Sequence, residues 1–192
     1  TENEGLKIKI LKDLDALLPA STIIATNTSS ISITQLAAAT KRPDRFIGMH
    51  FFNPAPLMKL VEVVKGNQTS HAVAETIMQL CKQLNKVPVL CKDAPGFIVN
   101  RVARHYYLEA MKLVEQGFAN IESVDEIMEA SGFKMGPFKL MDLIGMDINL
   151  AVSQSMYDAF KHEERFKPSP LQIKKVAKGE LGKKTGKGFY EY

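Results

Sequence analysis

The chain has 192 residues, a formal net charge of +4, 45% hydrophobic residues and 24% charged residues. This composition is typical of a globular protein and excludes a disordered chain and a collagen-like repeat. Two cysteines are too few for a disulfide scaffold, and no apolar run reaches the roughly 18–20 residues that a membrane helix needs.

Residues 1–95 combine helix patterns with strand patterns. A 3.6-residue apolar period predicts a first helix, which Pro19 ends and which carries Leu6, Ile10, Leu14, Leu17 and Leu18. Short β-branched or apolar runs predict strands over residues 22–26, 45–52, 59–64 and 87–91. A short helix is expected over residues 34–39, and Ser70 is expected to cap another helix.

The character changes after Pro95-Gly96. A long amphipathic helix is predicted from Val99 to near Gly117, followed by helices over residues 123–130, 137–144, 148–160 and 170–176. A strand pattern returns only at residues 188–192. We therefore expect an α/β domain over residues 1–95 and an all-α domain over residues 96–192.

His50 and Glu62 are the most interesting ionisable residues. His50 lies at the end of a predicted strand, where α/β sheets bind their ligands, and imidazole suits a general base. Glu62 interrupts an apolar strand, where a carboxylate is costly unless it is paired. If the two strands are neighbours, the carboxylate can orient the imidazole. From spacing alone, a solvent-facing Glu62 and an ordinary core histidine are the favoured alternative.

Other polar groups allow two readings each. The turn Asn27-Thr28-Ser29-Ser30 can bind a ligand or cap the next helix. Asn100 can face a cleft or solvent. The lysine- and glycine-rich tail around Lys184 can bind an anion or be a solvated surface, and it lacks the spacing of a phosphate loop. The four histidines and two cysteines have no metal-site spacing.

Several long motifs, in order along the whole chain, resemble the L-3-hydroxyacyl-CoA dehydrogenases, including the 3-hydroxybutyryl-CoA branch. They are Asn27-Thr28-Ser29-Ser30, Gly48-Met49-His50-Phe51-Phe52-Asn53-Pro54, Lys59-Leu60-Val61-Glu62-Val63-Val64, Asp93-Ala94-Pro95-Gly96-Phe97-Ile98-Val99-Asn100-Arg101, Met135-Gly136-Pro137-Phe138 and Lys184-Thr185-Gly186-Lys187-Gly188-Phe189-Tyr190. The resemblance implies the C-terminal half of an NAD-binding Rossmann-type domain, followed by a helical substrate and dimerisation domain.

The resemblance also implies a role for each matching residue. His50 matches the catalytic base, and Glu62 matches its paired carboxylate. Ser29 and Asn100 match residues that hydrogen-bond the substrate. The positions that match cofactor contacts to NAD are Glu2, Lys7, Ser29, Asn53 and Lys184.

The activity implied is hydride transfer between C3 of a 3-hydroxyacyl-CoA and NAD, which gives the 3-ketoacyl-CoA in fatty-acid β-oxidation or butyrate-type metabolism. The implied partner is a second copy, bound through the helical domain. No nucleic-acid or membrane partner is expected. A cytoplasmic location is expected, with the mitochondrial matrix as the alternative.

The start of the chain departs from the family pattern. Thr1 leads directly into helix periodicity, with no initiator methionine, and the family's glycine-rich pyrophosphate turn does not occur. We therefore expect that Thr1 is not the natural start and that these residues alone bind NAD poorly. Two alternatives to a dehydrogenase are a non-catalytic interaction module and nucleic-acid binding by the basic tail.

Overall fold

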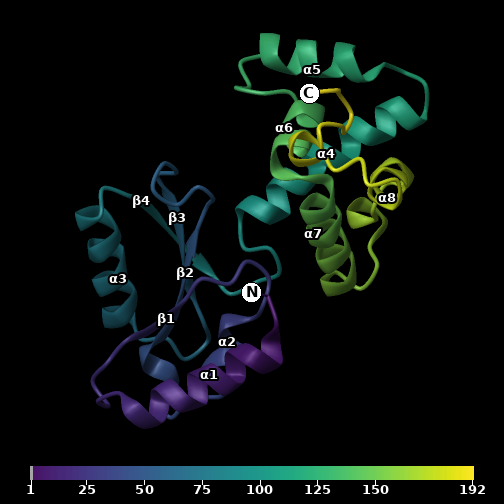
Figure 1. The fold of residues 1–192 in the computed structure, drawn as a ribbon. Coiled ribbons are helices and arrows are strands. Elements are labelled where there is room, and N and C mark those ends of the chain that lie inside the picture. Colours follow the sequence, from purple (N-terminus) through teal and green to yellow (C-terminus); the bar gives the residue numbers. More distant parts are fainter. Residues whose placement is uncertain (1) are drawn as a thin grey trace. The chain divides into compact units, whose positions relative to one another are not determined.

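The computed structural model describes residues 2–192, so the expectation about Thr1 lies outside the described residues. The chain forms two compact units, which divide between Ile98 and Val99. The first unit contains α1 (Glu4–Leu17), β1 (Ile24–Thr26), α2 (Ile33–Ala37), β2 (Phe46–Phe51), β3 (Leu60–Lys65), α3 (His71–Gln83) and β4 (Val87–Lys92) (Figure 1). The second contains α4 (Val99–Glu115), α5 (Ile121–Ala130), α6 (Pro137–Ile144), α7 (Met146–Ala159) and α8 (Pro170–Ala177).

The four strands form one mixed sheet in the order β1-β2-β3-β4. β1 is parallel to β2, β3 is antiparallel to β2, and β4 is parallel to β3. In the antiparallel pair, Gly48 is opposite Val64 and His50 is opposite Glu62. Because side chains alternate along a strand, these two pairs share one face of the sheet.

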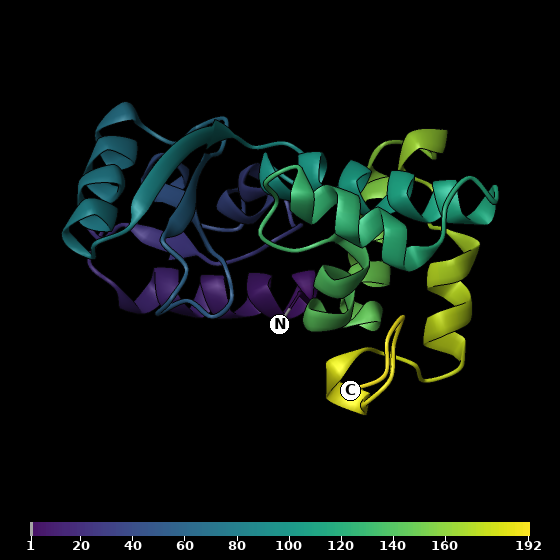
Figure 2. The same cartoon turned by 90° about the horizontal axis from the view of Figure 1, so that it is seen from above.

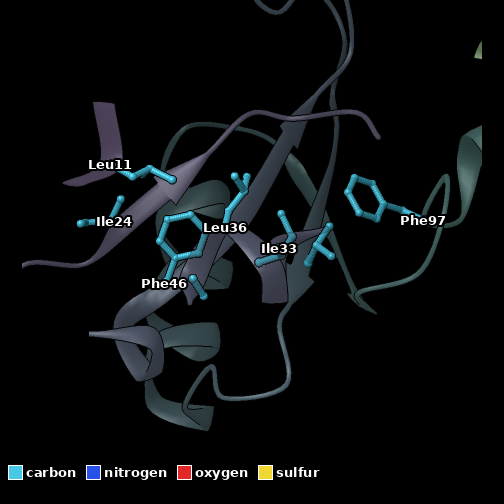
Figure 3. Packing of buried hydrophobic residues seen from close by; sticks show 8 residues of the cluster. Leu11, Ile24, Ile33, Leu36, Phe46 and Phe97 are labelled. Carbon is cyan, nitrogen blue, oxygen red and sulfur yellow. The ribbon is translucent and has the colours of Figure 1, made fainter. Parts of the chain in front are cut away.

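Helices cover both faces of this sheet, which is the Rossmann-like arrangement expected from the resemblance (Figure 2). On the face that carries His50, α1 and α2 pack through Leu11, Ile33 and Leu36 against Phe46 (Figure 3). On the opposite face, α3 packs against the alternate side chains of β2 and β3, which are Ile47, Met49, Val61 and Val63. Apolar side chains on both faces explain why these two strands read as nearly continuous hydrophobic runs.

Helix starts in the first unit are fixed by side-chain caps. Asn3 accepts a hydrogen bond from the backbone of Leu6, Ser32 caps α2, and Ser70 caps α3 as expected. The predicted apolar stripe of α1 has an unexpected orientation: Leu6, Ile10, Leu14 and Leu17 are exposed, whereas Leu11 is buried.

The end of α1 is held by Arg42. Its buried guanidinium pairs with Asp15 at 2.7 Å and donates to the backbone carbonyls of Asp15 and Leu18. The backbone N–H of Lys41 and the Arg42 side chain lower the pKa of Asp15. The guanidinium thus satisfies carbonyl groups that the end of a helix leaves without partners.

The second unit is helical and has its own core, formed where α4, α5, α6 and α7 meet. Its last residues correct the sequence prediction. Residues 188–192 form no strand, because the backbone N–H groups of Phe189 and Tyr190 donate to the buried carboxylate of Asp142. Only isolated bridges remain, such as that between Gly182 and Lys187.

Residues 2–192 contain neither a membrane-spanning helix nor a cluster of metal-binding side chains. None of the helices there is long and apolar enough to cross a membrane. No group of three or more His, Cys, Asp or Glu side chains is placed to hold a metal ion.

Candidate active site

The centre of the candidate site is a buried histidine–glutamate pair. His50 on β2 and Glu62 on β3 are register partners on the same face, with His50 Nδ1 2.8 Å from Glu62 Oε2. His50 is 4% exposed and Glu62 is 1% exposed, so neither residue faces bulk water. The antiparallel register therefore brings His50 and Glu62 into contact, which was one of the two alternatives left open by the sequence.

Hydrogen bonds to Glu62 define the tautomer of His50. The backbone N–H of Ile98 donates to Glu62 Oε1 at 2.9 Å, and the imidazole meets the other oxygen. A carboxylate only accepts hydrogen bonds, so Nδ1 carries the proton and Nε2 keeps its lone pair. That lone pair faces Ser29 Oγ at 3.0 Å. A basic nitrogen is thus aimed at the loop that follows β1.

Aromatic rings surround the imidazole. The ring centroid of Phe52 lies 4.7 Å from that of His50, and the ring of Phe97 lies edge-on at 5.7 Å. Phe97 is buried and belongs to the same core cluster as Ile33 and Leu36 of α2 (Figure 3). These rings exclude water from the pair, and lower local polarity strengthens the hydrogen bond between imidazole and carboxylate.

The loop after β1 is held by one of its own side chains, Asn27, and by one from outside it, Glu2. Asn27 Oδ1 accepts from the backbone N–H of Phe51, which ties the loop to the end of β2. The Glu2 carboxylate accepts from Thr28 Oγ1, from the backbone N–H of Ser29 and from Ser30 Oγ. Glu2 and Ser29, both predicted site residues, are therefore adjacent.

Two other predicted site residues lie in the same unit. Asn53 is exposed in the loop after β2, and Lys7 is half-buried in α1. The loop of Asn53 is fixed by Lys86, whose ammonium group donates to the carbonyls of Ala55 and Met58. Sequence reasoning missed Lys86, since a single lysine after a helix carries no signal for this contact.

Asn100 and Lys184 belong to the second unit. Asn100 is the second residue of α4. Lys184 pairs with Asp147 at the start of α7, and this hydrogen bond lowers the pKa of Asp147. Substrate binding by Asn100 and cofactor contact by Lys184 stay predictions.

Groups suited to a nicotinamide are present around the strand ends. Ser29 and Asn53 follow the carboxyl ends of β1 and β2, the edge at which α/β sheets bind their ligands. A hydroxyl and an amide can donate to and accept from a carboxamide. The residues present therefore fit the nicotinamide end of the cofactor.

Comparisons with known proteins identify the family. Residues 1–94 match the family model described as the NAD-binding domain of 3-hydroxyacyl-CoA dehydrogenase, and residues 96–192 match the model of its C-terminal domain. The chain belongs to the 3-hydroxyacyl-CoA dehydrogenase family.

The chain is similar to dehydrogenases from several organisms. The chain is 48% identical over its whole length to the mitochondrial hydroxyacyl-coenzyme A dehydrogenase of Sus scrofa, of which it covers 61%. It is 49% identical over 99% of its length to 3-hydroxyadipyl-CoA dehydrogenase of Escherichia coli, of which it covers 41%. The crystal structure of (S)-3-hydroxybutyryl-CoA dehydrogenase from Ralstonia eutropha superimposes on all of the chain, with a TM-score of 0.95 and 48% identity, and the match covers 68% of that protein.

The chain is shorter than these members of the 3-hydroxyacyl-CoA dehydrogenase family. The chain spans about three fifths of the mitochondrial relatives that it resembles.

Proposed function

We propose that this protein is an oxidoreductase that transfers a hydride between C3 of a 3-hydroxyacyl-CoA and NAD. The observation that carries the proposal is the buried His50–Glu62 pair, with His50 Nε2 open toward the Ser29 loop. The 3-ketoacyl-CoA is the oxidised form of the substrate. Fatty-acid β-oxidation and butyrate-type metabolism are the settings in which such a reaction occurs.

His50 acts as the general base in this proposal. As C3 becomes a carbonyl carbon, Nε2 takes the proton of the 3-hydroxyl group. Nδ1 keeps its hydrogen bond to Glu62, and the carboxylate stabilises the imidazolium that forms. In the reverse direction the imidazolium returns the proton to the carbonyl oxygen. General-base assistance of this kind accounts for about 10²–10⁴ in rate.

The remaining assigned residues position the reactants. Ser29 and Asn100 hydrogen-bond the substrate oxygens, and Glu2, Lys7, Ser29, Asn53 and Lys184 contact the cofactor. When bound, NAD supplies the hydride acceptor at its nicotinamide ring. The protein contributes orientation, exclusion of water by Phe52 and Phe97, and the proton relay through His50.

The proposal is tested by NADH oxidation with acetoacetyl-CoA, measured in a version of the protein as long as its relatives because the 192 residues alone are expected to bind NAD poorly. We expect His50→Gln to lower kcat by about 10²–10⁴-fold with a small change in KM, because the base is lost and the binding groups remain. His71→Gln is the matched control, since His71 forms an exposed pair with Glu75 on α3. Near-normal turnover in His50→Gln would remove His50 from the mechanism.

A second candidate is an interaction module without turnover. The observations that favour it are the exposed stripe of α1 and the exposed apolar side chains on the helices of the second unit, since such surfaces mark contact sites. NADH oxidation by the 192 residues alone, compared with a version as long as the relatives, separates the candidates. If only the longer version turns over, the 192 residues are an incomplete part of the enzyme. If neither version turns over, the result supports the interaction module.

A further inference from the structure

Ser29, His50 and Glu62 form a hydrogen-bonded relay in the order hydroxyl, imidazole, carboxylate. Ser29 Oγ is 3.0 Å from His50 Nε2, and His50 Nδ1 is 2.8 Å from Glu62 Oε2. This is the geometry by which serine hydrolases are recognised on unrelated folds. We propose that Ser29 is also a nucleophile that accepts acyl groups from thioesters and activated esters. This activity goes beyond the proposed hydride transfer and needs no cofactor.

The relay makes the serine hydroxyl reactive. A free hydroxyl group is a weak nucleophile, and an adjacent base within hydrogen-bond reach activates it. Because Glu62 holds the proton on Nδ1, the lone pair of Nε2 receives the Ser29 hydroxyl proton. All three side chains lie in the first unit, so the relay is complete within it.

Exposure within the relay also suits this chemistry. His50 and Glu62 are buried, whereas Ser29 is half-buried and can meet a ligand at the end of β1. The backbone N–H of the next residue, Ser30, has no hydrogen-bond partner among residues 2–192, so it is free to donate to a developing oxyanion. In hydrolases the residue after the nucleophile supplies one such donor.

Glu2 limits the rate of this reaction. Its carboxylate already accepts the backbone N–H of Ser29, so that group is not available to an oxyanion, and a negative charge lies close by. Loss of one oxyanion donor costs about 10²–10³ in rate in a serine protease. We therefore expect slow acylation that is seen best as a covalent adduct.

The bonds balance without an oxidant or reductant. Ser29 Oγ bonds to the thioester carbonyl carbon as its proton moves to His50 Nε2. The C–S bond then breaks, and the thiolate takes this proton and leaves as a thiol. Water attacks the acyl-serine ester and gives its proton to His50, which returns it to Oγ. The products are a carboxylic acid, a thiol and the free serine.

The test is acylation of the 192-residue chain by p-nitrophenyl acetate or acetoacetyl-CoA with no nicotinamide present. Intact mass and peptide mapping should find one acyl group on Ser29. We expect His50→Gln to slow its formation by about 10²-fold or more, and Ser29→Ala to abolish it. Ser21→Ala is the matched control, because Ser21 is an exposed serine of the same unit whose hydroxyl makes no hydrogen bond among the described residues.

The results separate this proposal from the dehydrogenase. Circular dichroism and thermal melts of each variant exclude unfolding as a cause, and Ser29→Cys, which keeps a nucleophile, should restore the adduct. An adduct on Ser29 without NADH oxidation supports the nucleophile alone. If Ser29 remains unmodified in the folded protein, or if it is acylated equally fast in His50→Gln, the proposal is wrong whatever the dehydrogenase assay gives.

Discussion

A carboxylate in the middle of a buried strand needs partners, and the partners of Glu62 include an imidazole ring and a backbone N–H group. One oxygen accepts from the His50 ring and the other from the backbone of Ile98. Removing one partner of such a buried pair leaves an uncompensated polar group, which costs more than a surface pair contributes. Glu62 is thus both a structural residue and the residue that fixes the proton of His50.

Glu62→Gln tests this dual role. An amide can donate to Nδ1 and so favours the wrong tautomer, in which Nε2 carries the proton and cannot act as a base. We expect kcat for NADH oxidation to fall by roughly 10²-fold or more and the pH–rate profile to change. Glu75→Gln, which breaks the exposed pair with His71, is the control. An unchanged pH–rate profile in Glu62→Gln would contradict a role through His50.

Sequence alone anticipated only part of this site. The residue types of His50, Glu62 and Ser29 indicated chemistry, but their contact depends on the antiparallel register of β2 and β3 across an irregular loop. The apolar pattern shows which side chains of a strand are buried, but the exact pairing of two strands also depends on the geometry of the loop between them, which periodicity does not give. Backbone groups such as the N–H of Ile98 are invisible in the sequence for the same reason. The catalytic roles themselves came from the resemblance and stay predictions.

At the scale of the elements, α2 packs tightly against β2 next to the site. A Cβ atom on Gly48 would lie 2.8 Å from Ile33 Cδ1 and 2.8 Å from Val64 Cβ. The Ile33 methyl group can move, but Val64 belongs to the neighbouring strand, so a larger residue must shift the β2–β3 pair. Two residues later on β2 is His50, and the packing at Gly48 therefore protects the site geometry.

Gly48→Ala should destabilise the protein by about 1–3 kcal/mol, the usual range for overpacking a dense core. Gly5→Ala is a matched control of opposite sign, because Gly5 lies in α1 with no close neighbour and alanine favours helix. Denaturant unfolding of both variants gives the comparison. Equal midpoints for Gly48→Ala and the parent protein would show that the strands adjust freely.

Sequence patterns predicted a helix or strand correctly where the residues of that element alone determine its structure. Apolar periodicity and a proline at the first position placed α6 at residues 137–144, as observed. The prediction failed at residues 188–192, because a carboxylate from α6 takes the backbone donors that a strand would use. The exposed stripe on α1 could not be anticipated either, since periodicity gives the apolar side of a helix without saying what covers it.

At the scale of the whole molecule, the change of pattern at Pro95-Gly96 predicted two parts, and the chain forms compact units on either side of the Ile98–Val99 bond. Composition could not show this, because each unit has an ordinary core of its own. The helices of the second unit also expose several large apolar side chains, and exposed apolar surface favours association.

We expect a homodimer formed through the helical unit. Val102 on α4 and Ile127 on α5 are 65% and 64% exposed, the most exposed large apolar side chains in the helices of that unit. Charging both, in Val102→Glu/Ile127→Glu, would place carboxylates in a buried interface, where an unpaired charge is costly. Light scattering after size exclusion should then change from two protomers to one. Leu17→Glu, on the exposed stripe of α1 in the other unit, is the control and should leave the mass unchanged. If the double variant remains a dimer at every concentration, these two positions do not lie in the interface. If the unmodified protein is a monomer, the protein does not form the expected dimer.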